Sequence, residues 1–399
     1  MALVRLSQLI AEDPAAAFLR RVVAGGRPAN AYLLYGPAGV GKGTAALAFA
    51  RALLCEGRPG APAAEAGLFA PEPVAGAAPD DACGRCAACL KTATLQHPDL
   101  KFLFPVSGEE RELAETIATT VQAVRDDPLF VFTYDKAASI RLSVTRELLR
   151  ELTFRPFEAA RRVVVVRDAD RMREDQYSAL LKSIEEPGAS TVWVLTSSRP
   201  SRLPATIHSR CQRVRFTPWP EATIAGFLGR QAGLEERQAR MLAALSSGSP
   251  GRALVLRHLD ATGERNQALA LLEPALAGNW PALWKAVQGV TGFGRTGREG
   301  MRRIIEFQQL WLRDVLRAGQ DAPREQLVHR DRERELRAQA ARMSPAEARR
   351  RLMVLEEVLG AIEGNVTPEL ALFSGLARLG GRRLGERDWP EHATARWDY

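Results

Sequence analysis

The stretch that decides the fold runs from residue 31 to residue 54 and reads AYLLY (31–35), GPAGVGK (36–42) and GTAALAFARALL (43–54). The first segment is a short apolar run typical of a buried parallel strand, and the third has the composition of a helix. The glycines and lysine between them have the spacing of a phosphate-binding loop, in which backbone amides surround phosphate and the lysine reaches its oxygens. We therefore expect a parallel α/β fold whose candidate nucleotide-binding residues are Gly36, Gly39, Gly41, Lys42, Gly43 and Thr44.

Two further buried strands are predicted downstream, at 163–166 (VVVV) and 192–195 (VWVL). Apolar residues at helical spacing predict a helix that begins near residue 140, with Ser143 as its N-cap, and a second helix over 175–186 that ends at Pro187-Gly188. A short helix is expected within 107–128. Strands and helices alternate, as in a parallel α/β domain.

The pattern changes after Phe216. Residues 221–259 show only helical periodicity, interrupted at 246–251, and residues 260–385 are long-period helix rich in Leu, Ala and Arg. We expect an α/β domain over 1–216, a small helical domain over 217–260 and a helical domain over 261–399.

The composition of the 399 residues, with 46% hydrophobic and 26% charged, is that of a folded globular protein. Neither a signal peptide nor a run of about 18 apolar residues is present, so we expect a cytoplasmic protein without a membrane partner. The net charge of +8 comes almost wholly from arginine. In an Ala-rich chain this bias permits a DNA partner without indicating one.

Four of the five cysteines have the spacing of a metal site: Cys83, Cys86 and Cys89 form two Cys-x-x-Cys pairs, and Cys55 ends the helix after the glycine loop. Four thiolates favour structural Zn²⁺, because no coordination position remains for a catalytic water. Disulfides or redox cysteines are the alternative, and a cytoplasmic setting disfavours them. His97 is interpreted as an ordinary loop histidine. Residues 57–80, rich in Gly, Pro and Ala, are expected to form a surface insertion within this zinc module (55–89).

The glycine loop departs from the pattern of a hydrolysing enzyme at two positions. Gly43 stands where a Ser or Thr hydroxyl coordinates Mg²⁺, and Thr44 comes one helical position late. Arg167 follows the strand 163–166 where the magnesium-directing Asp is expected, and Asp168 comes next. Because a guanidinium repels the ion, we do not expect Mg²⁺-dependent hydrolysis. ATP or ADP binding without turnover and a loop kept only for packing both remain open.

Taken in order, these features resemble the AAA+ clamp-loader family of bacterial DNA polymerase III. The similar segments are the loop 36–44, the four cysteines, QHPD (96–99), RPFE (155–158), VVRDADRM (165–172), ALLKSIEEP (179–187) and LPATIHSRC (203–211). They lie between residues 30 and 252. Several of these segments are weak signals of the family when taken singly, but their order along the chain is specific to it.

The resemblance implies an AAA+ α/β domain with an inserted zinc module, a helical lid over 217–260 and an all-α collar over 261–399. It also implies a stator-like subunit without ATPase activity of its own, in a five-membered ring with gamma/tau and delta subunits. Such a ring loads the sliding clamp onto primed DNA as part of a DNA polymerase holoenzyme. The alternatives are the ATP-hydrolysing gamma/tau motor, against which Arg167 counts, and a nucleotide kinase, which leaves the cysteines unexplained.

The resemblance further assigns Arg210, in Ser209-Arg210-Cys211, as the arginine that reaches the ATP phosphates of a neighbouring subunit. A permanently charged guanidinium added in trans accelerates phosphoryl transfer about 10³- to 10⁵-fold in well-studied NTPases. The alternative is a surface arginine. Ser197 and Ser198 stand at the family's phosphate-sensing position, and the alternative is that they are ordinary hydroxyls at a strand end. Arg252 is displaced by one residue from the lid sensor, and Lys182 and Glu185-Glu186 are interpreted as a solvated helix end.

Overall fold

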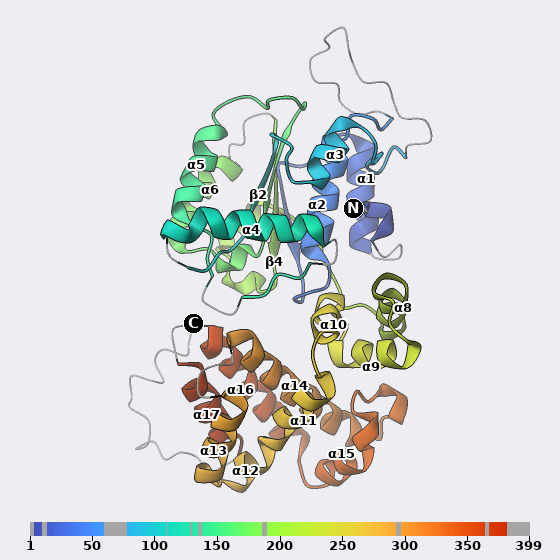
Figure 1. Cartoon of the computed structure of the whole chain (residues 1–399), viewed down its shortest axis with the longest axis vertical. Helices are drawn as coiled ribbons and strands as arrows, with labels where there is room; N and C mark the ends of the chain where they lie inside the picture. Colours follow the sequence, from blue (N-terminus) through green and yellow to red (C-terminus); the bar gives the residue numbers. More distant parts are fainter. Residues whose placement is uncertain are drawn as a thin grey trace. The chain divides into compact units, whose positions relative to one another are not determined.

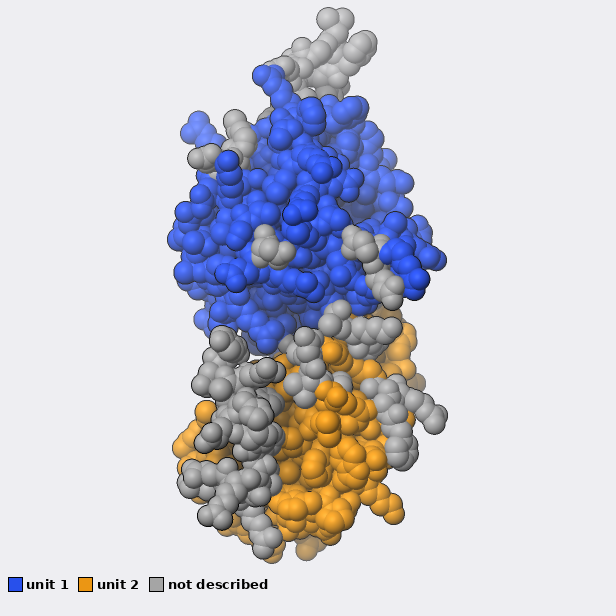
Figure 2. All heavy atoms as spheres, turned by 90° about the vertical axis from the view of Figure 1, so that its left-hand side faces the viewer, with its two compact units in different colours: residues 1–131, 138–220, 248–252 blue, residues 132–137, 221–247, 253–399 orange. Residues whose placement is uncertain are grey.

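The computed structural model describes residues 4–9, 14–59, 78–108, 110–127, 130–134, 138–185, 190–292, 297–363 and 367–380. The chain divides into two compact units, coloured in Figure 2. Unit 1 comprises residues 1–131, 138–220 and 248–252, and unit 2 comprises residues 132–137, 221–247 and 253–399. The glycine loop and all five cysteines therefore lie in unit 1.

Unit 1 is built on a parallel sheet with the strand order β2-β3-β4-β1-β5 in the described part of the chain. The strands are β1 (Ala31–Tyr35), β2 (Leu100–Leu103), β3 (Arg162–Val166), β4 (Thr191–Ser197) and β5 (Gln212–Arg215). In the central register Leu33 pairs with Leu195 of β4 and with Arg213 of β5. The predicted parallel α/β fold and both predicted downstream strands are confirmed.

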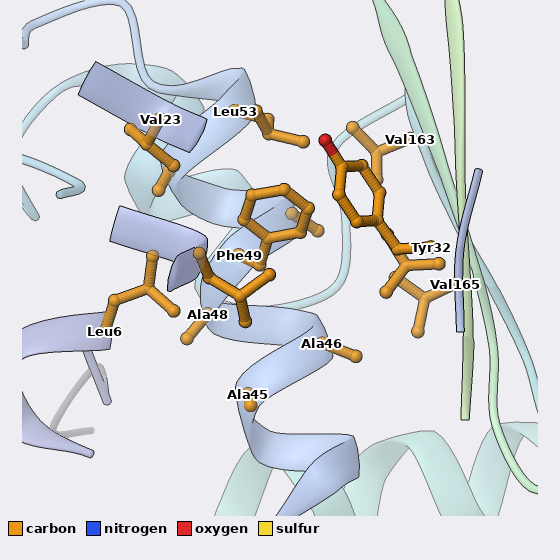
Figure 3. Packing of buried hydrophobic residues seen from close by; sticks show 14 of the residues in the cluster. Leu6, Val23, Tyr32, Ala45, Ala46, Ala48, Phe49, Leu53, Val163 and Val165 are labelled. Carbon is orange, nitrogen blue, oxygen red and sulfur yellow. The ribbon is translucent and has the colours of Figure 1, made fainter. Parts of the chain in front are cut away.

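Side chains from alternate positions of the strands form two apolar cores, one on each face of the sheet. Tyr32 and Val165 contribute to the core under α1 (Pro14–Gly25) and α2 (Lys42–Leu54). In that core the ring of Phe49 meets Tyr32 edge-on at 5.1 Å between centroids (Figure 3). Leu33 and Val166 contribute to the opposite core, under α5 (Leu142–Glu151) and α6 (Glu174–Glu185) (Figure 1). This double burial explains why the central strands are continuous apolar runs.

The remaining elements of unit 1 are α3 (Ala87–Ala93), α4 (Leu113–Asp126), α7 (Ala205–Arg210) and the 3₁₀ turns η1 (Leu6–Gln8), η2 (Glu110–Glu112), η3 (Ala169–Arg171) and η4 (Pro200–Arg202). α4 has 14 residues and is longer than the short helix expected within 107–128.

The sequence placed two helix boundaries differently from the structure. α5 begins at Leu142 with Arg141 as its N-cap, so the prediction that Ser143 is the N-cap is wrong: Ser143 is the second residue of the helix. α6 begins one residue before its predicted start. Its predicted end at Pro187-Gly188 lies outside the described residues, as does most of the insertion predicted over 57–80.

Unit 2 is helical in its described residues, as the sequence predicted. Its elements are α8 (Glu221–Ala232), α9 (Glu236–Ser246), α10 (Pro250–Leu256, which begins in unit 1), α11 (Ala261–Ala270), α12 (Leu272–Ala277), α13 (Trp280–Thr291), α14 (Arg298–Ala318), η5 (Arg324–Gln326), η6 (Arg330–Arg332), α15 (Glu333–Ala340), α16 (Pro345–Glu363), α17 (Pro368–Ala377) and η7 (Arg378–Gly380). The long α14 packs against α11, α15 and α16. On α14 the buried Asp314 accepts hydrogen bonds at 2.8 Å from the backbone N–H of His329 and from its ring. No helix in the described ranges has both the length and the apolar content to cross a membrane.

Candidate functional site

The loop between β1 and α2 depends on glycine for both its backbone and its close contacts. Gly39 and Gly41 have φ values of +73° and +98°, in the left-handed region that favours glycine. A Cβ on Gly36 would lie 2.2 Å from the carbonyl oxygen of Phe216, and one on Gly39 would lie 2.2 Å from Oγ of Ser249. The loop therefore has the glycine-dependent backbone typical of a phosphate loop and is enclosed by residues from elsewhere in unit 1.

Lys42 opens α2, and its ammonium group is buried. Its Nζ donates hydrogen bonds to the carbonyl oxygens of Gly36 at 2.9 Å and Pro37 at 2.5 Å, and to Oγ of Ser198 at 3.1 Å. Burial, opposed in part by the charge of Asp168, lowers the pKa of Lys42 to about 8. The ammonium group of Lys42 thus has three hydrogen-bond acceptors within the chain. One of them is Ser198, which is also one of the two candidate phosphate sensors.

Residues 248–252 and Trp219 pack on the same loop. The N–H of Gly251 donates to the carbonyl oxygen of Gly39 at 2.9 Å, and Nε1 of Trp219 donates to that of Val40 at 3.1 Å. A Cβ on Gly251 would lie 3.0 Å from Cα of Gly39. These contacts favour the interpretation that the loop is held in place by packing against Trp219 and residues 248–252.

Arg167, the first residue after β3, extends toward Gly43. A Cβ on Gly43 would lie 1.9 Å from Nη1 of Arg167. Nε of Arg167 also forms an ion pair with Oδ2 of Asp168 at 3.4 Å. Thr44, the displaced hydroxyl, is exposed. A cation therefore lies where an ATPase places its magnesium ligands.

The two acids that follow Arg167 also have partners in the chain. Asp168 has φ +46°, and its N–H donates to Oγ1 of Thr196 at 2.9 Å. Asp170 is buried, accepts from the N–H of Ser198 at 3.1 Å and forms an ion pair with Nε of Arg199 at 3.2 Å. Burial lowers the pKa of Arg199 to about 10. Both carboxylates are thus paired with arginines of unit 1.

The four predicted metal ligands lie together, since their sulfur atoms are all within 4.8 Å of one another. Cys55 follows α2, and Cys86 is the N-cap of α3. The Sγ atoms of Cys55 and Cys86 are 3.9 Å apart, and those of Cys83 and Cys89 are 3.8 Å apart. A tetrahedron with Zn–S bonds of about 2.3 Å has edges of about 3.8 Å, so the sulfur positions fit Zn²⁺. None of the five cysteines is in a disulfide.

Backbone amides contact these sulfurs, and the charges of two buried arginines act on them. The N–H groups of Cys83, Cys86 and Cys89 donate to sulfurs of the cluster at 3.3 to 3.4 Å. Hydrogen bonds from Cys55 and Cys89 lower the pKa of Cys86. The thiolate form of Cys86 is therefore favoured. These two arginines, Arg51 and Arg58, were not predicted from the sequence. A signal for the first exists, because Arg51 precedes Cys55 by one helical turn.

His97 is buried, and the cluster of four sulfurs does not include it. Its Nδ1 accepts from the N–H of Asp99 at 3.1 Å, and its Nε2 lies 3.3 Å from a carboxylate oxygen of Glu158. Asp99 in turn accepts three backbone N–H groups, from Phe157 at 2.7 Å and from Glu158 and Ala159 at 2.9 Å each. QHPD and RPFE, two of the motifs in the resemblance, are therefore parts of one hydrogen-bond network.

Arg210 is the last residue of α7, with about a third of its side chain exposed. Its Nε forms an ion pair with Oε1 of Glu185 at 2.7 Å, and Nη1 donates to the carbonyl oxygen of Thr206 and to Oγ of Ser209. Glu185, interpreted as part of a solvated helix end, is exposed at the end of α6 and is also the ion-pair partner of the candidate trans arginine. Cys211, the next residue, is buried, and burial raises its pKa to about 12.

Comparison with known proteins shows which family this chain is similar to. The family model described as "DNA polymerase III, delta subunit" matches residues 11–220. DNA polymerase III subunit delta' of Pseudomonas aeruginosa is 35% identical over 253 residues, 62% of each chain. The delta' subunit of Escherichia coli is 28% identical, over 66% of this chain and 65% of its own. DNA polymerase III subunit gamma/tau of Mycobacterium tuberculosis is 26% identical, over 94% of this chain and 60% of its own. The chain thus spans less than two thirds of the length of each of these relatives.

Among solved structures, a DNA polymerase III gamma subunit-related protein from Thermotoga maritima is 16% identical and has a TM-score of 0.40, with 92% of this chain and 98% of that one covered. The Bacillus subtilis clamp loader delta protein is 13% identical with a TM-score of 0.26, over 92% and 99% of the two chains.

Proposed function

We propose a function on the premise that this chain belongs to the family of DNA polymerase III delta subunits, whose model matches more than half of its residues. Within the clamp-loader subunits of that polymerase, we assign it the delta' role. In this role it does not hydrolyse ATP, and it assists hydrolysis by a neighbouring subunit through Arg210. Arg210 would contact the phosphates of the neighbour's nucleotide.

The contact between Arg167 and Gly43 carries this proposal. Two unit charges about 4 Å apart cost on the order of 4 kcal/mol at an effective dielectric near 20, and Mg²⁺ doubles that cost. Neither residue offers an oxygen ligand to the ion. Lys42 is engaged by Gly36, Pro37 and Ser198, which supports a loop without a catalytic function.

The partners follow from the same assignment. We propose that the chain joins gamma/tau and delta subunits in a five-membered ring that loads the sliding clamp onto primed DNA. The α/β part (1–216) would present Arg210, residues 217–260 would form the lid, and residues 261–399 would form the collar of the ring.

We further propose that Cys55, Cys83, Cys86 and Cys89 hold one structural Zn²⁺. The observation that supports it is the sulfur spacing of 3.8 to 3.9 Å. When bound, the ion would cross-link the end of α2 to α3. Four thiolates leave no open coordination position, so the ion would have no part in a reaction.

The gamma/tau motor is the second candidate, and the 26% identity to that subunit over 94% of this chain favours it. It requires a magnesium site, which Arg167 opposes. Membership in the family leaves the nucleotide kinase without support.

Steady-state ATPase assays separate the two candidates. We expect the purified chain to show no Mg²⁺-dependent turnover, and we expect the loader reconstituted with gamma/tau and delta to lose DNA-stimulated activity when this chain carries Arg210→Ala. Arg240→Ala is the matched control, because Arg240 is an exposed arginine paired with Glu236. Turnover by the isolated chain would support the motor instead, and full activity of the Arg210→Ala loader would remove the trans role.

A further inference from the structure

The guanidinium of Arg210 has partners in its own chain at two of its three nitrogens. Nε lies 2.7 Å from Oε1 of Glu185, and Nη1 lies 3.2 Å from the carbonyl oxygen of Thr206 and 3.1 Å from Oγ of Ser209. Within the described residues, Nη2 makes no hydrogen bond. The side chain is therefore fixed on two of its nitrogens while the third remains available.

The position of Glu185 is itself determined by the core. Glu185 is the last residue of α6, and Arg210 is the last residue of α7. Ile184 and Ile207, which lie on the same two helices, are buried in one apolar cluster under the sheet. Packing of these two helices therefore brings the carboxylate of Glu185 and the guanidinium of Arg210 together.

Stability alone does not account for this pair. Both side chains are more than a third exposed, and ion pairs at such exposure contribute little to folding. An arginine, however, loses much rotamer freedom when it binds a phosphate, and a fixed guanidinium loses less. The benefit of the pair would thus appear when the arginine binds an anion.

We propose that Glu185 is the positioning residue for Arg210: it holds Nε so that Nη2 is presented to the phosphates of a neighbouring subunit's nucleotide. This inference rests on the trans role of Arg210 given above. Orientation requires only an acceptor oxygen, and a negative charge next to the phosphates would by itself be unfavourable. A neutral amide at residue 185 should therefore serve as well as the carboxylate.

The test uses the reconstituted loader with this chain as wild type, Glu185→Ala, Glu185→Gln, Arg210→Ala and the double variant Glu185→Ala/Arg210→Ala. We expect Glu185→Ala to lower kcat of the DNA-stimulated ATPase about 5- to 10-fold with the KM for ATP within twofold of wild type. Loss of an interaction made only in the transition state has this signature. Glu185→Gln should retain at least half of the wild-type kcat, and the double variant should match Arg210→Ala.

The control variant is Glu236→Ala, which removes the carboxylate of another exposed arginine ion pair and should leave kcat unchanged. Thermal melting of each purified variant should stay within 2 °C of wild type, because the Glu185 pair is exposed.

The outcomes separate this inference from the function on which it rests. If Arg210→Ala lowers kcat while Glu185→Ala does not, or if Glu185→Ala raises it, the positioning role is wrong and the trans role stands. A further loss in the double variant would show that Glu185 acts independently of Arg210 and would also overturn the inference. Wild-type activity of Arg210→Ala would instead remove the proposed function.

Discussion

The guanidinium of Arg167 fills the space beside Gly43, so that a Cβ at residue 43 would lie 1.9 Å from Nη1. The sequence shows two separate departures from an ATPase pattern, a glycine in place of a hydroxyl and an arginine in place of an acid. In the structure they form one feature, because the small residue admits the large cation.

The first prediction is that substitutions at these two positions are energetically coupled. Gly43 is the second residue of α2, and alanine is favoured over glycine in a helix by up to about 1 kcal/mol. We expect Gly43→Ala to stabilise an Arg167→Ala variant by about 0.5 kcal/mol or more and to give no gain in the wild type, where the guanidinium must move. Chemical denaturation of the four proteins measures the coupling, and equal effects of Gly43→Ala in both backgrounds would exclude it.

The second prediction concerns the metal. We expect about one zinc per chain by elemental analysis of protein purified under reducing conditions. Cys89→Ser should lose most of this zinc and lower the melting temperature, because structural Zn²⁺ contributes directly to folding free energy. Cys211→Ser is the matched control and should keep its zinc, since Cys211 lies outside the cluster. Zinc-free wild-type protein with unchanged stability would contradict the assignment.

The third prediction is a pH dependence of stability due to Cys211. Burial raises the pKa of its thiol from 9.0 to about 12, so the folded state retains a proton that the unfolded state loses. The stability that this proton contributes is fully present below about pH 9 and is lost as the pH rises toward 12, at up to about 1.4 kcal/mol per pH unit.

We therefore expect the free-energy difference between wild type and Cys211→Ala to be constant from pH 6 to 8. Between pH 9 and 10, the unfolding free energy of the wild type should fall relative to that of Cys211→Ala. Ionisation of the other thiols is common to both proteins and cancels in this difference. A difference independent of pH up to 10 would show that the thiol titrates normally.

The fourth prediction concerns Asp99, which is fully buried and accepts hydrogen bonds from three backbone N–H groups. Asp99→Asn replaces one acceptor oxygen by an NH₂ group, which leaves at least one buried donor without an acceptor. We expect a loss of about 2 to 4 kcal/mol in unfolding free energy. Glu158→Gln, at a partly exposed side chain of the same network, should cost under about 1 kcal/mol. Equal costs would argue that the network does not hold the segment 157–159.

The central strands were predictable because they are buried on both faces, which leaves no polar position in VVVV (163–166). The edge strands were not. β5 has one buried side chain, Val214, between polar neighbours, and β2 includes Lys101. An edge strand with these residues is formed by pairing with its neighbour, and its own sequence carries no signal of that pairing.

The candidate site likewise has one part that could be predicted from the sequence and one part that could not. The cysteine cluster was predictable because ligand spacing is local to the chain, apart from Cys55. The contacts of Gly39 with Ser249 and Gly251, and of Arg210 with Glu185, were not, because they join residues distant in sequence. Buried arginines such as Arg51 were also missed, since composition alone assigns arginine to the surface.

Arg58 is 2% exposed, and its guanidinium donates to the carbonyl oxygens of Ala52 and Pro79. It thereby links two points of the chain that lie before and after residues 60–77. Protease cleavage anywhere in that stretch should yield two fragments that co-elute in native buffer and separate only in denaturant. The same position should accept an affinity tag or a fluorescent reporter without loss of the fold.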